Sequence, residues 1–377
     1  MFSILYRYVF TGMMGPFAVN LVFFSLIFLT TKLLEITNLI VNYRIGFFNI
    51  LMLFMYSMPA FLVFVIPMSV MMGVLLTFLR MSTDNEILAL KSGGVSLYRM
   101  LPPVAAFSVI GAVLTAVMTF WGMPWGNSAF EDVVYRMSTA NPNIALKERT
   151  FNDAFDDVLL YADTIDLKEN TMQDIFIEDR RSAGQVGTII ADKGKLIGKP
   201  KDFVVAMRLY DGLINRVDIE KKTSSTTTFH TYDMAISLKN AAAASEKRKD
   251  KDEEEMRFSE LRQFIAGAKE KNTDYYKALI EFHNKFSIPA ACLVLGLLAV
   301  PLGVRAKARK KSYGLGLGLF FFLCYYALMS LGWVLGESGT YPPAIGIWVP
   351  NVVMGGVAVF MFVRSAAEKP LGFWKRG

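Results

Sequence analysis

The sequence contains little that could form a catalytic or metal centre. Among its 377 residues there are only 2 cysteines and 2 histidines. Cys292 and Cys324 both lie in apolar stretches, which excludes a disulfide framework and favours small buried side chains. His230 and His283 lack the spacing of metal ligands, and no nucleophile motif accompanies them. We therefore expect no catalytic residues and no metal site in this chain.

A nucleotide-binding loop is missing as well. The segment "GKLIGK" (194–199) has one residue too few between its glycines, and Pro200 stands where a phosphate loop has Ser or Thr. We expect the chain to bind no ATP, magnesium or other cofactor of its own. A partner must then supply the energy for any transport.

Charged residues are scarce, whereas apolar residues are abundant and clustered. Charged residues make up 19% of the chain and hydrophobic residues 53%, while soluble proteins carry about 25% charged residues. The second apolar run exceeds the length that a bilayer needs and contains Pro59 and Pro67, so we expect a kink or an interfacial piece there. The first run shows no cleavage pattern of a signal peptide and is read as a retained span. Six runs satisfy the length rule for membrane spans, at about 12–34, 47–79, 101–121, 286–304, 314–336 and 343–363.

Ionisable residues are nearly absent from these runs. The middles of the second, third, fifth and sixth runs carry none. Lys32 and Glu35 lie near one end of the first run, and Lys285 lies at the start of the fourth. Proton- and sodium-driven carriers generally need ionisable residues at membrane depth, which disfavours an autonomous secondary transporter.

The net charge of +7 is concentrated beside the apolar runs. In a soluble protein, basic segments such as 304–313 and 368–377 would suggest nucleic-acid binding. Next to membrane spans they are typical of cytoplasmic flanks, so we expect no nucleic-acid partner. Basic residues near Arg7, in 80–100, in 305–311 and at the C-terminus alternate consistently with the spans. Both termini are then cytoplasmic, and residues 122–285 lie on the other side, which in a bacterium is the periplasm.

The polar insert of residues 122–285 shows the period of β-strands. Alternating, β-branched runs predict antiparallel strands over 157–166, 173–181, 187–198, 203–220 and 226–238. Lys193-Gly194 and Asp211-Gly212 are interpreted as turns. Strands at this spacing typically close into a small sandwich or a jelly roll. We expect residues 241–255 to form a mobile linker.

The predicted fold is a polytopic α-helical membrane protein with six transmembrane helices and a periplasmic all-β jelly-roll domain inserted between helices three and four. The expected divisions are 1–121 for the first three spans, 122–256 for the β domain and its charged linker, 257–285 for a periplasmic helical connector, and 286–377 for the last three spans and the basic tail.

A short charged segment, "RMSTDNEILALKSGGVSLYRM" (80–100), interrupts the apolar sequence. Thr83 and Glu86 have the spacing of a capping box, in which Thr83 caps a helix over 83–92 and Glu86 reaches back to its amide. A helix this short does not stand alone in water and needs a surface to pack on. That surface is either the protein's own helical bundle or a separate ATPase, in which case the segment is a coupling helix.

Four segments of this sequence resemble one family. They are "LYRYVF" (5–10), "IPMSVMMGVLLTFLRMSTDNEILALKSGGVS" (66–96), "MPWGN" (123–127) and "HNKFSIPAACLVLGLLAVPLGV" (283–304). In this order, and with three spans on each side of a β domain, the chain resembles the permease subunits of the bacterial lipopolysaccharide exporter, the LptF/LptG family. Between the two paralogues the sequence favours LptF.

The resemblance implies an assembly in the inner membrane of a Gram-negative bacterium. Two paralogous permeases would form a heterodimer on a cytoplasmic ABC ATPase dimer, which holds the ATP and magnesium. Lipopolysaccharide would enter between span one of one subunit and span five of the other. It would then pass through the β domain to a single-span periplasmic jelly-roll protein and a periplasmic bridge built by strand addition.

The resemblance also implies site residues. Glu86 occupies the place of an acidic residue on the family's coupling helix, and the expected ATPase contact consists of Glu86, Thr83, Asp84, Ile87, Leu88 and Leu90. Basic residues at the periplasmic end of span one approach the lipid phosphates in this family, so the expected lipopolysaccharide-binding residues are Lys32 and Arg44. The alternative for Lys32 is that its side chain extends to the membrane interface without binding phosphate. Glu35, close to Lys32, either joins this site or neutralises the lysine. The interior of the β domain, whether conduit or ordinary core, is expected to include Phe176, Ile189, Val205, Leu209 and Leu213.

Two other functions fit the sequence less well. Permeases for lipoprotein release or drug efflux also carry extracytoplasmic domains, but they typically have four spans in each subunit. A membrane scaffold whose β domain recruits partners would not depend on Glu86.

Overall fold

The structure is a computed structural model. It describes residues 2–43, 47–140, 148–155, 158–166, 171–181, 185–201, 204–218, 223–237, 251–268, 271–305, 311–339 and 341–367. The chain separates into two compact units. The helical unit comprises residues 1–32, 54–128 and 252–377, and the β unit comprises residues 33–53 and 129–251. Most of the expected linker, 241–255, lies outside the described residues.

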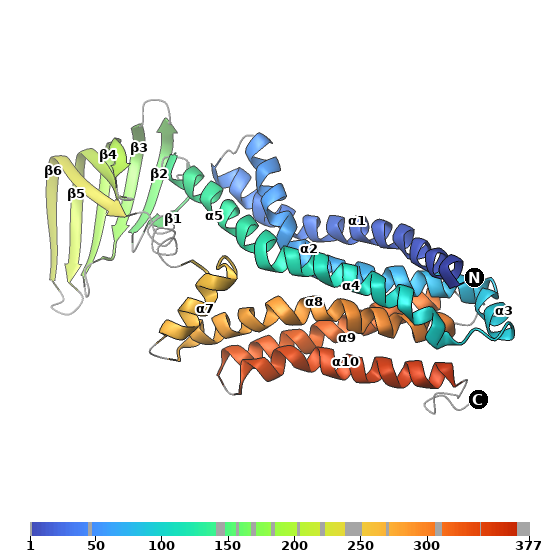
Figure 1. Ribbon diagram of the computed structural model, residues 1–377. Helices are drawn as coiled ribbons and strands as arrows, with labels where there is room; N and C mark the ends of the chain where they lie inside the picture. Colours follow the sequence, from blue (N-terminus) through green and yellow to red (C-terminus); the bar gives the residue numbers. More distant parts are fainter. Residues whose placement is uncertain are drawn as a thin grey trace, which may run out of the picture. The chain divides into compact units, whose positions relative to one another are not determined.

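Six helices among the described residues are long and apolar enough to cross a membrane, as the sequence predicts. Helical structure begins and ends beyond several predicted spans, and the expected connector is divided between α7 and the first part of α8. Both Pro59 and Pro67 lie inside α2, so the described part of the second run is one continuous helix. The helical elements are α1 (Phe2–Tyr43), α2 (Phe47–Thr83), α3 (Glu86–Ser92), η1 (Leu97–Met100), α4 (Leu101–Val117), the π turn η2 (Met118–Gly122), α5 (Met123–Ala140), α7 (Phe258–Gly267), α8 (Thr273–Arg305), α9 (Lys311–Glu337) and α10 (Pro343–Ala366) (Figure 1).

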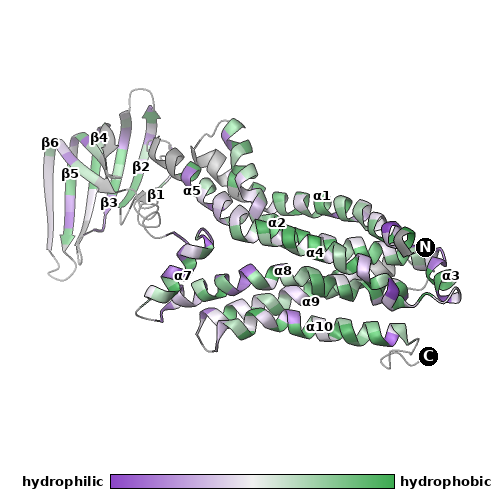
Figure 2. Ribbon diagram, viewed as in Figure 1, coloured by the Kyte–Doolittle hydropathy of each residue, from purple (hydrophilic) through white to green (hydrophobic). Residues whose placement is uncertain are grey.

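Small residues let the helices of the helical unit approach closely. A methyl group added at Gly296 of α8 would lie 2.1 Å from the Ser108 hydroxyl of α4, and one at Gly111 would lie 2.4 Å from Val70 of α2. Such small-residue contacts replace the hydrophobic driving force that lipid removes. The helices are mostly hydrophobic along their lengths, and hydrophilic residues gather at α3 and around α7 (Figure 2).

One end of the helical unit brings together the segments that the sequence assigns to the cytoplasm. The start of α1, helix α3 and the end of α10 lie at this end (Figure 1). Ser82 near the end of α2 donates a hydrogen bond to the carbonyl of Val304 near the end of α8, at 3.0 Å. The ring of Tyr98 packs edge-on against Phe362 of α10. The basic flanks at Arg80, Arg305 and Arg364 therefore share one end, as alternating spans require.

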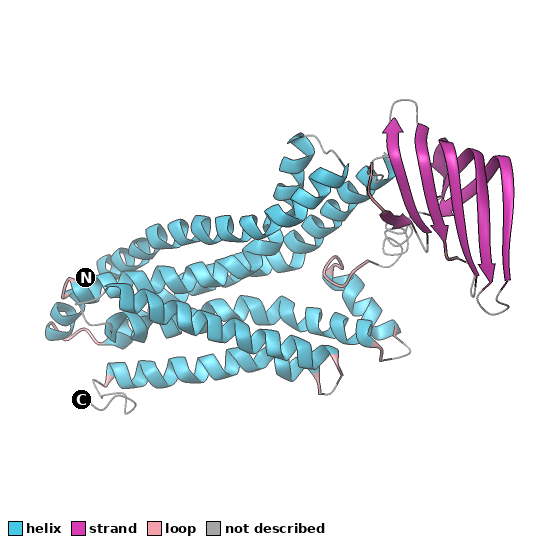
Figure 3. Ribbon diagram, turned by 180° about the vertical axis from the view of Figure 1, so that it is seen from behind, coloured by secondary structure: helices cyan, strands magenta, loops and turns pink. Residues whose placement is uncertain are grey.

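The β unit contains one antiparallel sheet with its strands in sequence order, a meander (Figure 3). The inserted all-β domain and its five predicted strands are confirmed, and the short β1 is an addition. The order differs from the Greek-key connection that defines a jelly roll. The strands are β1 (Asn152–Phe155), β2 (Val158–Asp166), β3 (Thr171–Asp179), β4 (Gln185–Lys201), β5 (Val204–Asp218) and β6 (Thr223–Ser237).

A crease crosses this sheet at one level. At this level, one residue on each of β2 to β6 is not paired with its neighbour across the sheet. The register of the paired residues is the same on both sides of that residue. The buried positions change phase there, as on β2, where Leu160 and Ala162 are buried and then Ile165. Asp174 and Asp211 at the crease have φ of 51° and 45°. Asp tolerates this left-handed conformation, which turns the following side chains to the opposite face. The crease residues are Asp163, Asp174, Asp192, Asp211 and His230.

The crease divides the sheet into two walls that share one core. The first wall contains 158–162, 175–179, 185–191, 212–218 and 223–229, and the second contains 164–166, 171–173, 193–201, 204–210 and 231–237. Ile177 and Ile189 of the first wall belong to the same buried cluster as Met207 and Leu209 of the second. The packing is therefore sandwich-like. The interpretation of Lys193-Gly194 and Asp211-Gly212 as turns is wrong, because both lie inside strands at the crease.

We predict that Gly212→Ala destabilises the β unit, because the added methyl group would lie 2.2 Å from the carbonyl oxygen of Ile190, which cannot move aside. Overpacking of this kind costs about 1–3 kcal/mol. Gly187→Ala is the matched control, since its methyl group would meet ordinary contacts at 3.7 Å or more. Limited proteolysis of the full-length protein should cleave the Gly212 variant within 129–251 sooner than the wild type and the control. Equal protection of both variants would contradict this account of the crease.

Candidate functional site

Helix α3 begins later than the sequence predicts and without a capping box. It runs from Glu86 to Ser92, preceded by Asn85 in a left-handed conformation and with no side-chain cap. Thr83 is the last residue of α2, and its hydroxyl donates to the carbonyl of Leu79 at 2.8 Å. The capping-box prediction is wrong because α2 continues through the proposed cap. The carboxylate of Glu86 is thereby available for another partner.

Helix α3 buries only one side against the helical unit. Ile87 is 4% exposed and belongs to the main core, and Leu90 packs against that core. Leu88 is 64% exposed, and Asp84 is exposed as well. Residues 83–91 therefore do not face their own helices alone. The structure leaves an apolar side chain and an acidic side chain at the surface, which is compatible with the expected contact to a second protein.

The carboxylate of Glu86 binds the first helix. The hydroxyl of Tyr8 on α1 lies 2.9 Å from both Oε1 and Oε2 of Glu86. The guanidinium of Arg80, near the end of α2, lies over the Tyr8 ring at 5.9 Å from its centroid, which is a cation–π distance. Neither contact was predicted, because nothing in the sequence relates Tyr8 to a residue 78 positions later.

Lys32 is half-buried on α1 and shares its surroundings with an acidic residue. Burial and the neighbouring charge of Asp252 raise the pKa of Glu254, in the turn before α7, although the positive charges of Lys32 and Lys285 oppose the shift. Lys32 and Glu254 are therefore within electrostatic reach of each other. The side chain of Glu35 and the whole of Arg44 lie outside the described residues, so their predicted roles stay predictions.

A buried ion pair on α8 is the main feature that the sequence did not predict. Lys285 is fully buried, and its Nζ lies 3.4 Å from Oε1 of Glu281, one turn earlier. Asn284 donates to Oε2 of Glu281 at 3.3 Å and accepts a hydrogen bond from Nε1 of Trp333 on α9, also at 3.3 Å. The four-residue spacing of Glu281 and Lys285 is the sequence feature from which this ion pair could have been predicted. Lys285 lies about 30 Å along α8 from Arg305, close to the far boundary of a bilayer.

The π turn explains the second partner of Lys285. Within η2 the hydrogen bonds run from residue i to i−5, as when the N–H of Met123 donates to the carbonyl of Met118. The next donor in this register is Pro124, which has no N–H to offer to the carbonyl of Thr119. Nζ of Lys285 donates to that carbonyl at 3.2 Å. The ion pair therefore fastens α8 to the junction of α4 and α5.

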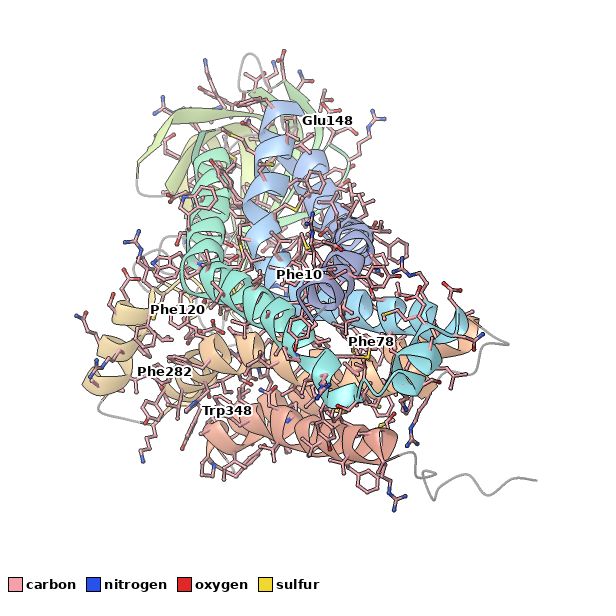
Figure 4. All side chains as sticks on the ribbon, turned by 45° about the vertical axis from the view of Figure 1, so that its right-hand side comes forward. Phe10, Phe78, Phe120, Glu148, Phe282 and Trp348 are labelled. Carbon is pink, nitrogen blue, oxygen red and sulfur yellow. The ribbon has the colours of Figure 1, made fainter. Side chains whose placement is uncertain are left out.

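Aromatic side chains pack around the same junction. Phe120 of η2 lies against Phe258 of α7 and Phe286 of α8, with ring centroids 5.4 Å apart in both pairs. Phe282 of α8 stacks on Phe258 at 5.4 Å. Figure 4 labels Phe120 and Phe282 on these neighbouring elements. The aromatic rings and the ion pair together join the junction of α4 and α5 to α7 and α8.

The expected interior residues of the β unit are only partly brought together. Ile189 and Leu209 are buried in its shared core. Phe176 and Leu213 are half-buried, and the side chain of Val205 lies outside the described residues. Ile189 and Leu209 therefore belong to a sandwich-like core.

Comparison with known proteins gives one consistent result. Residues 7–364 match the sequence model of the family "Lipopolysaccharide export system permease LptF/LptG". The chain is 23% identical over 340 residues to the lipopolysaccharide export system permease protein LptF of Escherichia coli K12, a match that covers 89% of this chain and 88% of that protein. The protein of the same description from Shigella flexneri matches to the same extent.

Proposed function

Because the chain belongs to the LptF/LptG family of lipopolysaccharide export permeases, we propose that it is the transmembrane part of an ABC-type exporter whose ATP and magnesium are bound by a separate cytoplasmic ATPase. The chain is a multi-pass inner-membrane permease subunit of lipopolysaccharide export. Its partners in this proposal are an ATPase dimer, a paralogous permease, a single-span periplasmic jelly-roll protein and the periplasmic bridge. The chain itself hydrolyses nothing.

The half-buried helix α3 is the observation that carries the proposal. Ile87 anchors it in the core, while Leu88 and Asp84 remain at the surface. A short helix fixed on one side and exposed on the other can transmit a push from a neighbouring protein without unfolding. The ATPase contact then includes Glu86, Thr83, Asp84, Leu88 and Leu90, whereas Ile87, also expected in this contact, is buried in the core of its own chain.

The orientation follows from the charges. Arg80, Arg305 and Arg364 share one end of the helical unit, and basic residues are retained on the cytoplasmic side. We place both termini and α3 in the cytoplasm and the β unit in the periplasm. Lipoprotein-release and efflux permeases, with four spans in each subunit, agree less well with six candidate spans.

The lipid path in this proposal starts at helix α1. Helices α1 and α9 are the least buried of the six candidate spans among the described residues. Val22, Phe23 and Leu26 of α1 are each more than half exposed. Such surfaces suit acyl chains or the α9 surface of a paralogous permease, with Lys32 near the lipid phosphates.

The test is photocrosslinking in the complete exporter. The chain is purified with its paralogue and the ATPase in membranes that contain lipopolysaccharide, with a photoreactive amino acid at position 32 or, as control, at the exposed Val353 in the middle of α10. We expect capture of lipopolysaccharide from position 32 and little from position 353, with ATP lowering the yield as lipid leaves. Equal capture from both positions, or a chain that recovers no ATPase, would refute the proposal.

A further inference from the structure

We infer that Tyr8 is the positioning residue that couples helix α3 to helix α1, so that movement of α3 turns the first span about Pro16. This inference rests on the proposed function, because it takes α3 to be the element that the ATPase moves. It adds the mechanical step between that helix and the span that borders the lipid.

The contact itself is specific. A single hydroxyl, that of Tyr8, lies 2.9 Å from both oxygens of Glu86, the first residue of α3. Arg80 lies over the ring of Tyr8. Since Glu86 serves no cap, its carboxylate is held by α1. A displacement of α3 therefore acts directly on the first turns of α1.

The first turns of α1 are fastened to α2. Val9 and Met13 are fully buried. A methyl group added at Gly73 of α2 would lie 3.2 Å from the carbonyl of Met13, so the two backbones are close there. Phe10 and Phe17 both pack edge-on against Phe107 of α4, at 5.7 and 5.5 Å between ring centroids. This part of α1 moves with the helices that carry α3.

Pro16 ends the fastened part. It has no N–H to donate to the carbonyl of Gly12, four residues earlier, and this carbonyl accepts a hydrogen bond from the hydroxyl of Thr77 on α2 at 3.0 Å instead. No atom lies within 4 Å of a methyl group added at Gly15, so the helix has room to bend beside the proline. The missing hydrogen bond weakens α1 between Gly12 and Pro16.

Beyond Pro16, one face of helix α1 is exposed, while Phe24 on the other face is buried in the main core and Phe28 stacks on Phe61 of α2. Val19 is 69% exposed and Val22 is 60% exposed. A bend at Pro16 therefore swings the exposed apolar face and shifts the contacts of Phe24 and Phe28 with the rest of the helical unit. The arrangement is a lever in which Tyr8 receives the displacement, Pro16 is the pivot, and residues 18–33 move against lipid or a partner.

Tyr8→Phe tests the inference, since it removes one hydroxyl and keeps the ring under Arg80. We expect unchanged recovery of the ATPase and about tenfold less lipopolysaccharide extracted per ATP hydrolysed, the order expected for a lost hydrogen bond to a charged acceptor. Tyr98→Phe is the matched control, because this tyrosine lies at the same end with its ring against Phe362. It should match the wild type in both measurements.

A distance measurement separates a lever from a merely structural role. Spin labels at Ser92 of α3 and Val22 of α1, both exposed, should change their separation during ATP turnover in the wild type and not in the Tyr8 variant. Extraction per ATP at the wild-type level in Tyr8→Phe would overturn the inference. A wild-type exporter that recovers no ATPase would instead refute the proposed function, so the two failures are distinguishable.

Discussion

Replacing Glu86 by lysine is expected to abolish coupled transport while leaving the helical unit folded. The carboxylate lies at the start of an α3 that packs through Ile87 and Leu90, so its charge contributes little to the core. Removing one partner of a hydrogen-bonded charge pair at an interface costs about 2–5 kcal/mol, and reversing its sign adds repulsion. Recovery of the ATPase, or lipopolysaccharide extracted per ATP, should fall about 30-fold or more.

The matched control reverses a charge at the other end of a span. Glu337 is exposed at the end of α9, the end opposite to the one that begins beside the basic 305–311 segment. Glu337→Lys should retain the ATPase and transport normally. Glu86→Ala should lie between the wild type and Glu86→Lys. If all three variants recover and use the ATPase like the wild type, α3 is not the coupling element.

Replacing Lys285 by methionine is expected to be the most damaging change to stability. It leaves the Glu281 carboxylate buried with its cation gone, and it also removes the donor to the Thr119 carbonyl. Breaking a buried ion pair by deleting one partner costs about 3–5 kcal/mol. The detergent-solubilised protein should unfold at a lower temperature and yield less monodisperse material.

A second variant decides whether charge is the cause. Glu281→Met with Lys285→Met removes both charges and keeps the packed volume, and replacing a buried pair by apolar residues is often neutral. The double variant should recover most of the lost stability, except for the unsatisfied Thr119 carbonyl. Thermal unfolding of Lys285→Met at the wild-type temperature would show that the ion pair does not fasten α8 to the π turn.

The spans and most strands could be predicted because their signals are local. Twenty apolar residues in a row need a bilayer, and alternation over nine residues needs a half-buried sheet. The same local reasoning failed at Thr83 and Glu86. Their spacing satisfies a capping box, but the long apolar helix before them extends through Thr83 and releases Glu86 to Tyr8. A contact between residues so far apart in sequence leaves no periodic signal.

The prolines in the spans indicate unpaired backbone carbonyls, which an analysis of hydrophobic periodicity does not detect. Pro16 and Pro124 each deprive a backbone carbonyl of its usual donor, and in a membrane such a carbonyl needs another. Thr77 and Lys285 provide the replacements. The sequence could therefore predict that polar partners exist near these prolines, but only the fold identifies them. The turn predicted at Asp211-Gly212 was wrong for a similar reason. Asp followed by Gly is typical of a turn, but the same pair also suits a left-handed residue inside a strand.

The row of crease residues gives the β unit a hinge that runs across its strands. Hydrogen bonds between neighbouring strands lie on either side of this line, so swinging one wall about it leaves the ladders intact. The two walls meet through apolar side chains such as Ile189 and Leu209. An apolar ligand that replaced those contacts would separate the two walls, and the β unit would open and close again with its backbone hydrogen bonds unbroken.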